Sequence, residues 1–169
     1  DRTVSRGLGD VYKRQALSWL SIAIFGSLPF IFSEIELSLT DAFFESMSGI
    51  TTTGSTIITN LNETPKGILL WRGMLQWLGG IGIIVMAITL MPLMNIGGMQ
   101  LFVISTSDTP EKILPRSKEI ALRLILVYSG LTFICASFYK IFGMNFFDSI
   151  VHSMTTIATG GFSNYNESI

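Results

Sequence analysis

Residues 41–54 read Asp-Ala-Phe-Phe-Glu-Ser-Met-Ser-Gly-Ile-Thr-Thr-Thr-Gly, and residues 148–161 read Asp-Ser-Ile-Val-His-Ser-Met-Thr-Thr-Ile-Ala-Thr-Gly-Gly. Aligned from Asp41 and Asp148 without gaps, the two stretches share six identities in 14 positions. With the same offset, the apolar segment before the first stretch aligns with the apolar segment before the second. Because similarity at a fixed period is typical of a repeated structural unit, we expect one unit to occur twice.

Each stretch is predicted to begin with a short helix. Ser38 and Asn145 lie three residues before Asp41 and Asp148, which suits a helix N-terminus because the first side chain can cap backbone N–H groups and the carboxylate favours the positive end of the helix. About 12 helical residues would span about 18 Å at 1.5 Å per residue. Since the apolar layer of a bilayer is about 30 Å thick, we expect the chain to enter the membrane partway and return.

A run rich in Thr and Gly follows each predicted helix, over residues 51–56 and residues 158–163, and we name these runs the first and the second filter strand. Irregular backbone inside a membrane is tolerated where protein buries it or where it lines a water-filled cavity. Gly allows the positive φ angles that turn successive carbonyls toward one axis, and Thr can add a hydroxyl oxygen. Such strands replace the hydration shell of the ion in potassium channels. We therefore predict that these runs form a selectivity filter whose oxygen atoms replace the hydration shell of a hard cation.

The composition favours a membrane protein. Of the 169 residues, 49% are hydrophobic and 14% are charged, and the mean hydropathy is +0.53, whereas soluble domains carry about 25% charged residues. Residues 16–33, 68–94 and 121–144 are each long and apolar enough to be a transmembrane helix. The 11 basic residues nearly balance the 12 acidic ones, and there is one Cys and one His, so the sequence argues against nucleic-acid binding, a zinc site and a disulfide framework.

The charges between the apolar segments indicate the orientation. Residues 34–66 carry five acidic residues and one Lys, whereas residues 95–123 carry four basic residues. Because cytoplasmic loops are enriched in Lys and Arg, residues 95–123 are placed inside and residues 34–66 outside. The chain would then cross the membrane twice between the filter strands, so both strands enter from the same side.

The chain divides into four expected parts. Residues 1–15 carry four of the basic residues and are predicted to be either foreign sequence or a natural basic cytoplasmic flank. Residues 16–94 form the first unit, residues 95–120 form a cytoplasmic loop, and residues 121–169 form a second unit truncated after its filter strand.

These residues resemble the membrane subunit of the Trk/Ktr potassium uptake systems, and more closely the TrkH branch. The resemblance covers essentially everything from Leu17 onward. The specific matches are residues 41–54, 65–72, 76–84, 97–102 and 158–163. The resemblance implies an all-α membrane protein of four potassium-channel-like units around one pseudo-fourfold pore, each with an outer helix, a re-entrant pore helix with its filter strand, and an inner helix. Carried over residue by residue, it narrows the first filter strand to Thr52, Thr53, Gly54 and Ser55 and the second to Thr159, Gly160, Gly161 and Phe162. It also implies that potassium is held through Thr52, Thr53, Thr159 and Gly160. Four units with the period of this repeat need more than twice the present length, so we expect this chain to be a fragment covering roughly the first two units.

The resemblance also implies a function and partners. It implies potassium uptake across the inner membrane of a bacterial cell, with potassium as the transported ion and no catalytic chemistry. Family members form homodimers in the lipid bilayer and bind a cytoplasmic ring of nucleotide-binding subunits similar to TrkA. A sodium-dependent transporter of the Ktr branch and a structural membrane subunit without transport are the alternatives, and symport with protons or sodium is left open.

Several residues outside the filter strands carry expectations of their own. Glu45 and His152 align in the repeat and are expected to make hydrogen bonds or packing contacts rather than to bind ions. Arg72 is expected either to anchor the outer membrane interface or to discourage ions near the entrance. Residues 108–118 are expected to form a short cytoplasmic connection, and the family resemblance makes them a candidate contact with the regulatory ring. Four glycines of the first inner helix are expected to allow close helix packing: Gly73, Gly79, Gly80 and Gly82.

Overall fold

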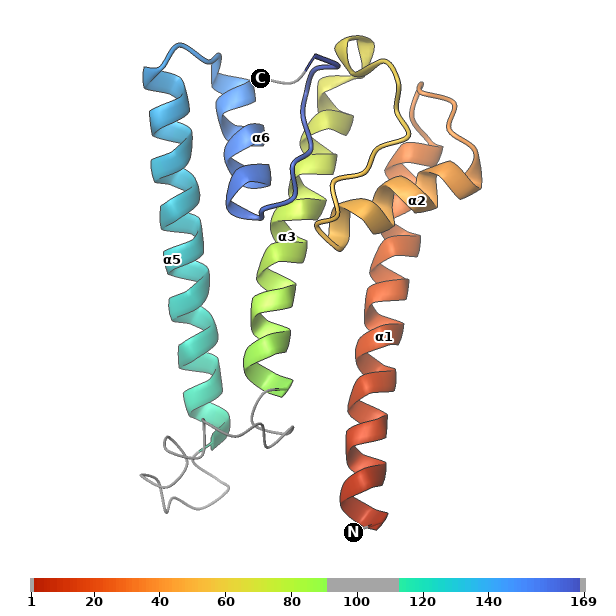
Figure 1. The fold of residues 1–169 in the computed structure, drawn as a ribbon, viewed down its shortest axis with the longest axis vertical. Helices are drawn as coiled ribbons and strands as arrows, with labels where there is room; N and C mark the ends of the chain where they lie inside the picture. Colours follow the sequence, from red (N-terminus) through yellow and green to blue (C-terminus); the bar gives the residue numbers. More distant parts are fainter. Residues whose placement is uncertain (1, 91–112, 168–169) are drawn as a thin grey trace.

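A computed structural model describes residues 2–90 and 113–167, and within these ranges the chain is helical and contains no β-strand. The three long helices are α1 (Arg2–Ile31), α3 (Lys66–Leu90) and α5 (Ile113–Ile141). The two short ones are α2 (Leu39–Ile50) and α6 (Phe146–Ile157), and a 3-10 turn, η1, covers Leu61–Glu63. Both short helices lie toward the same end of the long ones (Figure 1). The predicted all-α class and the order of long and short helices are confirmed.

The long helices correspond to the three expected spans, with different bounds. Among the described residues, α3 over Lys66–Ala87 and α5 over Glu119–Ile141 are long and apolar enough to cross a membrane, and α1 does not meet the same criterion. The reason is that α1 is apolar only from Ala16 onward and ends at Ile31, two residues before the expected end. Its polar N-terminal half belongs to the same helix, so no structural boundary falls at residue 15.

The connection between the second and third spans also differs from the expectation. Helix α5 begins at Ile113 rather than at residue 121, so the end of the expected loop over residues 95–120 is helical. Pro115 is compatible with this position because the N–H groups of a first helical turn have no helical partner, so the donor that Pro lacks is not needed. Residues 95–112 of that loop lie outside the described residues, as does the first part of the expected partner contact.

Both short helices begin and end where the sequence predicts. The side chain of Ser38 accepts a hydrogen bond from Asp41 N in α2, and that of Asn145 accepts one from Asp148 N in α6. Each helix has 12 residues, and after each the chain turns back toward the end from which it came (Figure 1). Both stretches therefore form a short helix followed by a returning strand at the same end of the long helices, as a re-entrant path requires.

Helix α3 lies between α2 and α6 in space (Figure 1), and its glycines allow both to approach. A Cβ atom on Gly79 would lie 1.9 Å from Ile50 O at the end of α2. A Cβ atom on Gly73 would lie 3.0 Å from Val151 Cγ1 of α6. The expectation that these glycines serve close packing is confirmed, and it explains how one inner helix contacts both filter strands.

Candidate functional site

The two filter strands share an unusual backbone conformation. Thr52 and Thr159 have φ angles of 55° and 54°, and Gly54 and Gly161 have φ angles of 80° and 78°. The residue between each pair, Thr53 or Gly160, is not among the residues with positive φ. Residues with positive φ therefore alternate with a residue without it in both strands, and such alternation lets successive carbonyl groups face the same side. The repeat seen in the sequence extends to the backbone angles.

The N–H groups of the filter strands are bonded to the ends of the short helices. Thr52 N donates to Gly49 O at 3.0 Å, and the equivalent Thr159 N donates to Thr156 O at 3.0 Å. The next residues repeat the pattern, with Thr53 N bonded to Ser48 O at 3.0 Å and Gly160 N bonded to Thr155 O at 2.9 Å. Within the described ranges, no donor is bonded to the carbonyl oxygens of the four predicted ligand residues. Those oxygens therefore keep their lone pairs free of protein hydrogen bonds within these ranges.

The two filter strands lie against each other, as the prediction of one shared pore requires. A Cβ atom on Gly54 would lie only 1.9 Å from Gly160 O and 3.7 Å from Gln76 Nε2. Thr53, Thr159 and Gly161 are exposed, whereas Gly160 is buried. The structure thus brings together residues that are more than one hundred positions apart in the chain, with glycine at the point of closest approach.

Ser55 and Phe162, at the outer ends of the filter strands, are held from behind. Ser55 O accepts a hydrogen bond from Ser48 Oγ at 2.6 Å, so this carbonyl faces the short helix α2. The ring of Phe162 is 4% exposed and lies over the guanidinium of Arg72, with 4.1 Å between Arg72 Cζ and the ring centroid. The side chain of Phe162 therefore fills the space behind the filter and is not directed toward an ion.

Glu45 and Arg72 form a buried ion pair beside the filter strands. Arg72 Nε donates to Glu45 Oε1 at 2.7 Å, and the two side chains are 1% and 0% exposed. Glu45 also accepts hydrogen bonds from Thr56 Oγ1 at 2.9 Å and from Ile57 N at 3.0 Å. The hydrogen-bonding role expected for Glu45 is confirmed. Neither role expected for Arg72 is observed, because its charge is buried and neutralised by Glu45 instead of facing the membrane interface or the ion entrance.

Gln76 is a residue of the site that the sequence analysis missed. It lies one helical turn after Arg72 in α3, is 0% exposed, and its Oε1 accepts a hydrogen bond from Phe162 N at 3.2 Å. A Cβ atom on Gly160 would lie 2.3 Å from the Gln76 side chain. The available signal was a polar residue four positions from Arg72 in an otherwise apolar span, since such residues in membrane helices usually face the protein interior.

The second strand is tied to its own short helix through Asp148. Asp148 Oδ1 accepts from Asn164 Nδ2 at 2.6 Å, and Asp148 Oδ2 accepts from Tyr165 OH at 2.6 Å and from Asn145 Nδ2. Burial raises the pKa of Asp148, but these hydrogen bonds outweigh it, so the pKa lies below its ordinary value. Burial lowers the pKa of the neighbouring His152, which keeps this imidazole neutral at pH 7. His152 is buried, which is compatible with the packing role expected for it.

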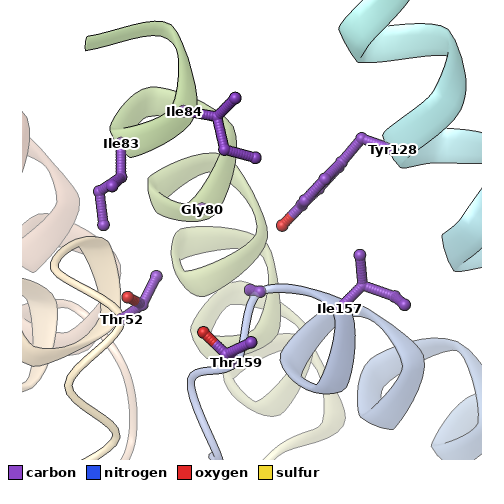
Figure 2. Close-up of a pocket in the computed structure, with 8 residues that line it drawn as sticks. Thr52, Gly80, Ile83, Ile84, Tyr128, Ile157 and Thr159 are labelled. Atoms are coloured by element: carbon purple, nitrogen blue, oxygen red, sulfur yellow. The ribbon is translucent and has the colours of Figure 1, made fainter. Parts of the chain in front are cut away.

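A cavity of about 260 Å³ opens at the inner ends of the filter strands. Thr52 and Thr159 line one side of it, Ile83 and Ile84 of α3 line another, and Tyr128 of α5 points into it (Figure 2). The C-terminal end of α6 also contributes, through Ile157 and Ala158. Because the C-terminal end of a helix carries partial negative charge, a cation in this cavity would be favoured beside the first residues of both strands.

Comparison with known proteins gives consistent matches. A family model described as TrkH, cation transport protein, matches residues 5–169. The chain is 49% identical over 152 residues to the Trk system potassium uptake protein TrkI of Halomonas elongata, covering 90% of this chain and 31% of that protein. It is 48% identical over 159 residues to the Trk system potassium uptake protein TrkH of Escherichia coli strain K12, covering 90% of this chain and 32% of that protein.

A solved structure matches as well. The crystal structure of the potassium transporter TrkH from Vibrio parahaemolyticus superimposes with a TM-score of 0.76 at 45% sequence identity, covering 89% of this chain and 29% of that chain. This chain thus spans about a third of the length of the curated relatives it matches. The family match extends over nearly all residues and is joined by relatives of high identity, so the chain belongs to the TrkH family of cation transport proteins.

Proposed function

We propose that this chain supplies the first two units of a four-unit potassium uptake pore, with residues 16–94 as the first unit, residues 95–120 as a cytoplasmic loop and residues 121–169 as the second unit. Potassium passes between the filter strands and exchanges its hydration water for backbone carbonyl oxygens. The membrane potential drives uptake, at about 2.3 kcal/mol per elementary charge per 100 mV. The relatives named as Trk system potassium uptake proteins support potassium as the ion.

One observation carries this proposal: the two filter strands are equivalent in backbone conformation and in hydrogen bonding. Their left-handed residues have nearly equal φ angles at equivalent positions, 55° against 54° and 80° against 78°. Both strands direct their N–H groups to the preceding helix, which leaves carbonyl oxygens for an ion. An ordinary polar turn has no need for this second copy, so the observation disfavours a structural subunit without transport.

The remaining parts of the proposal concern assembly. We place the protein in the bacterial inner membrane as a homodimer that binds a cytoplasmic nucleotide-binding ring similar to TrkA. Large exposed apolar side chains on α1 and α5 support burial against lipid or protein, among them Phe25 at 69% and Phe133 at 75% exposure. Residues 1–15 then form a flank outside the filter-bearing units.

A full-length chimera tests the function of these residues. Residues 16–167 of this chain replace the matching segment of the E. coli TrkH, and the chimera is expressed in a strain that lacks its own potassium uptake systems. We expect growth at low external potassium, together with uptake of rubidium as a potassium tracer. Membrane abundance is measured by quantitative immunoblot against the parent TrkH.

The chimera gives a clear outcome in either direction. Absence of uptake at parental membrane abundance would contradict the proposal. A second chimera carries only residues 38–58 and 145–165 of this chain. It keeps the long helices of the E. coli TrkH, so fewer helix contacts are changed in the same test. Loss of uptake in this second chimera, too, would show that these strands do not function as a potassium filter.

A further inference from the structure

We infer that Arg72 is a positioning residue for the second filter strand: held by Glu45, its guanidinium fixes the outer end of that strand and thereby sets the preference of the pore for potassium over sodium. The inference rests on the proposed function of the filter strands. It assigns no ion ligand to Arg72, which acts through the ring of Phe162 and the backbone carbonyl of Ser163.

The guanidinium of Arg72 makes three different contacts at once. Its Nε is paired with Glu45, its Nη1 donates to Ser163 O at 3.1 Å, and its plane lies over the Phe162 ring at 4.1 Å. A planar fork with several donors suits this combination, whereas an ammonium group is a point charge that cannot reproduce it. Two successive residues of the second filter region are therefore held by one side chain of α3.

The ion pair also connects the two units at equivalent points. Glu45 accepts from Thr56 Oγ1 behind the first strand, and Arg72 donates to Ser163 O behind the second. Thr56 and Ser163 occupy the same position in the repeat. Thr56, Glu45, Arg72 and Ser163 thus form a continuous link between the outer ends of both filter strands.

Gln76 supports the same strand one turn along α3. Its Oε1 accepts from Phe162 N at 3.2 Å, beside the Ser163 carbonyl bonded by Arg72. Residues four apart lie on one face of a helix, so Arg72 and Gln76 hold the strand as a pair. Since the described residues contain no β-ladder, side-chain hydrogen bonds of this kind act together with the backbone bonds of Thr159 and Gly160 to hold the strand in place.

The pairing also explains how a cationic side chain is tolerated close to a cation path. Glu45 neutralises Arg72, and both side chains are almost fully buried. Whether selectivity comes from the size of a filter site or from the number and field of its carbonyl oxygens, displacement of the strand alters it. The geometry therefore points to an effect on selectivity and not only on folding.

The direct test is Arg72→Lys in the full-length chimera, with rubidium and sodium uptake measured in parallel. Lys keeps the positive charge beside Glu45 but loses the simultaneous contacts with Ser163 and Phe162. We expect the rubidium-to-sodium uptake ratio to fall by about tenfold, which corresponds to about 1.4 kcal/mol. Lys66→Arg is the matched control, because Lys66 is an exposed cation at the start of the same helix, and its ratio should not change.

A charge-neutral pair of substitutions separates positioning from electrostatics. In the double variant Glu45→Gln and Arg72→Gln no charge remains unpaired, yet the guanidinium contacts are gone, so the ratio should stay low. A ratio restored to the parental value would overturn the inference in favour of simple charge balance. Phe162→Leu provides a test independent of the ion pair, and it should also lower the ratio because the stacked ring is lost.

The outcomes for the two proposals differ. A parent chimera that transports no rubidium contradicts the proposed function itself. A parent chimera that transports rubidium selectively, together with an unchanged ratio in Arg72→Lys at parental membrane abundance, contradicts only the inference. If Arg72→Lys does not reach the membrane, an unchanged ratio in Phe162→Leu overturns it.

Discussion

At the residue scale, the backbone of Thr52 and Thr159 departs most from ordinary behaviour. A β-branched residue with positive φ is rare, and such strain costs on the order of 1–3 kcal/mol per residue. The same angle nevertheless occurs at equivalent positions of both strands, 55° and 54°. Backbone strain of this kind clusters at ligand-binding sites, and its repetition here agrees with a role in ion coordination.

The sequence predicts some of these backbone conformations and not others. Positive φ was foreseeable at Gly54 and Gly161, because glycine adopts it without a steric penalty, and it is observed there. It was not foreseeable at Thr52, because the local propensity of Thr opposes it. Gly160 is required for a different reason, since the Gln76 side chain occupies the place of its Cβ. That constraint comes from a residue far away in the chain and leaves no local signal.

The carboxylate of Asp148 leads to a prediction on stability. In Asp148→Asn the charge that accepts bonds from Asn164 and Tyr165 is lost, and hydrogen bonds to charged groups are each worth about 1.5–3 kcal/mol. We expect a lower Tm of the purified full-length chimera at pH 7. Because the folded pKa of Asp148 is depressed, its contribution is complete above the unfolded pKa of about 3.9 and is lost as the pH falls through the folded value.

The Tm difference between parent and Asp148→Asn should therefore be constant near neutral pH. It should narrow below about pH 4, where the carboxylate of the unfolded parent begins to take up a proton while that of the folded parent is still ionised. Asp41→Asn is the matched control, because Asp41 occupies the equivalent helix position but its side chain makes no hydrogen bond within the described ranges. It should lower the Tm less. Equal Tm values for Asp148→Asn and the parent at pH 7 would contradict this account.

At the element scale, the short helices were predictable and the role of α3 was only partly so. Capping is a local interaction over three residues, and both caps lie where the sequence places them. The glycines of α3 indicated close packing, but the neighbours they admit, α2 and α6, come from different units. The contacts of Arg72 were misjudged because its partners, Glu45 and Ser163, lie 27 and 91 positions away. Burial by distant segments decides the role of such a charge.

The close approach of α2 and α3 makes Gly79 sensitive to substitution. In Gly79→Ala the new Cβ atom would lie 1.9 Å from Ile50 O, which is backbone and cannot rotate away. Overpacking of this kind costs about 1–3 kcal/mol, so we expect a lower Tm of the full-length chimera and reduced rubidium uptake. Gly130→Ala is the control, since no atom lies within 4 Å of its Cβ position. Identical Tm values for the two variants would argue against tight packing at Gly79.

At the scale of the whole molecule, the internal repeat predicted two equivalent strands, and the structure places them side by side with α3 between their helices. The periodic sequence pattern carried this information because each copy repeats the same caps, helix length and turn. The difference in side-chain hydrogen bonds between the two units was harder to predict from the sequence. The carboxylate that accepts hydrogen bonds from the residues after the first strand is Glu45. After the second strand this role belongs to Asp148, which occupies a different position in its helix. Side-chain networks diverge between copies while the backbone is retained.

We propose that both filter strands contribute to one potassium path. Ion uptake by three variants of the full-length chimera tests this proposal: Gly54→Ser, Gly161→Ser and the control Gly67→Ser. Rubidium and sodium uptake are measured at matched membrane abundance. Gly54 and Gly161 have φ angles of 80° and 78°, and a Cβ atom on Gly54 would also meet Gly160 O. We expect loss of potassium preference in both filter variants, more severe in Gly54→Ser, and parental selectivity in Gly67→Ser, whose Cβ position is open. Parental uptake and selectivity in Gly54→Ser would contradict the proposal.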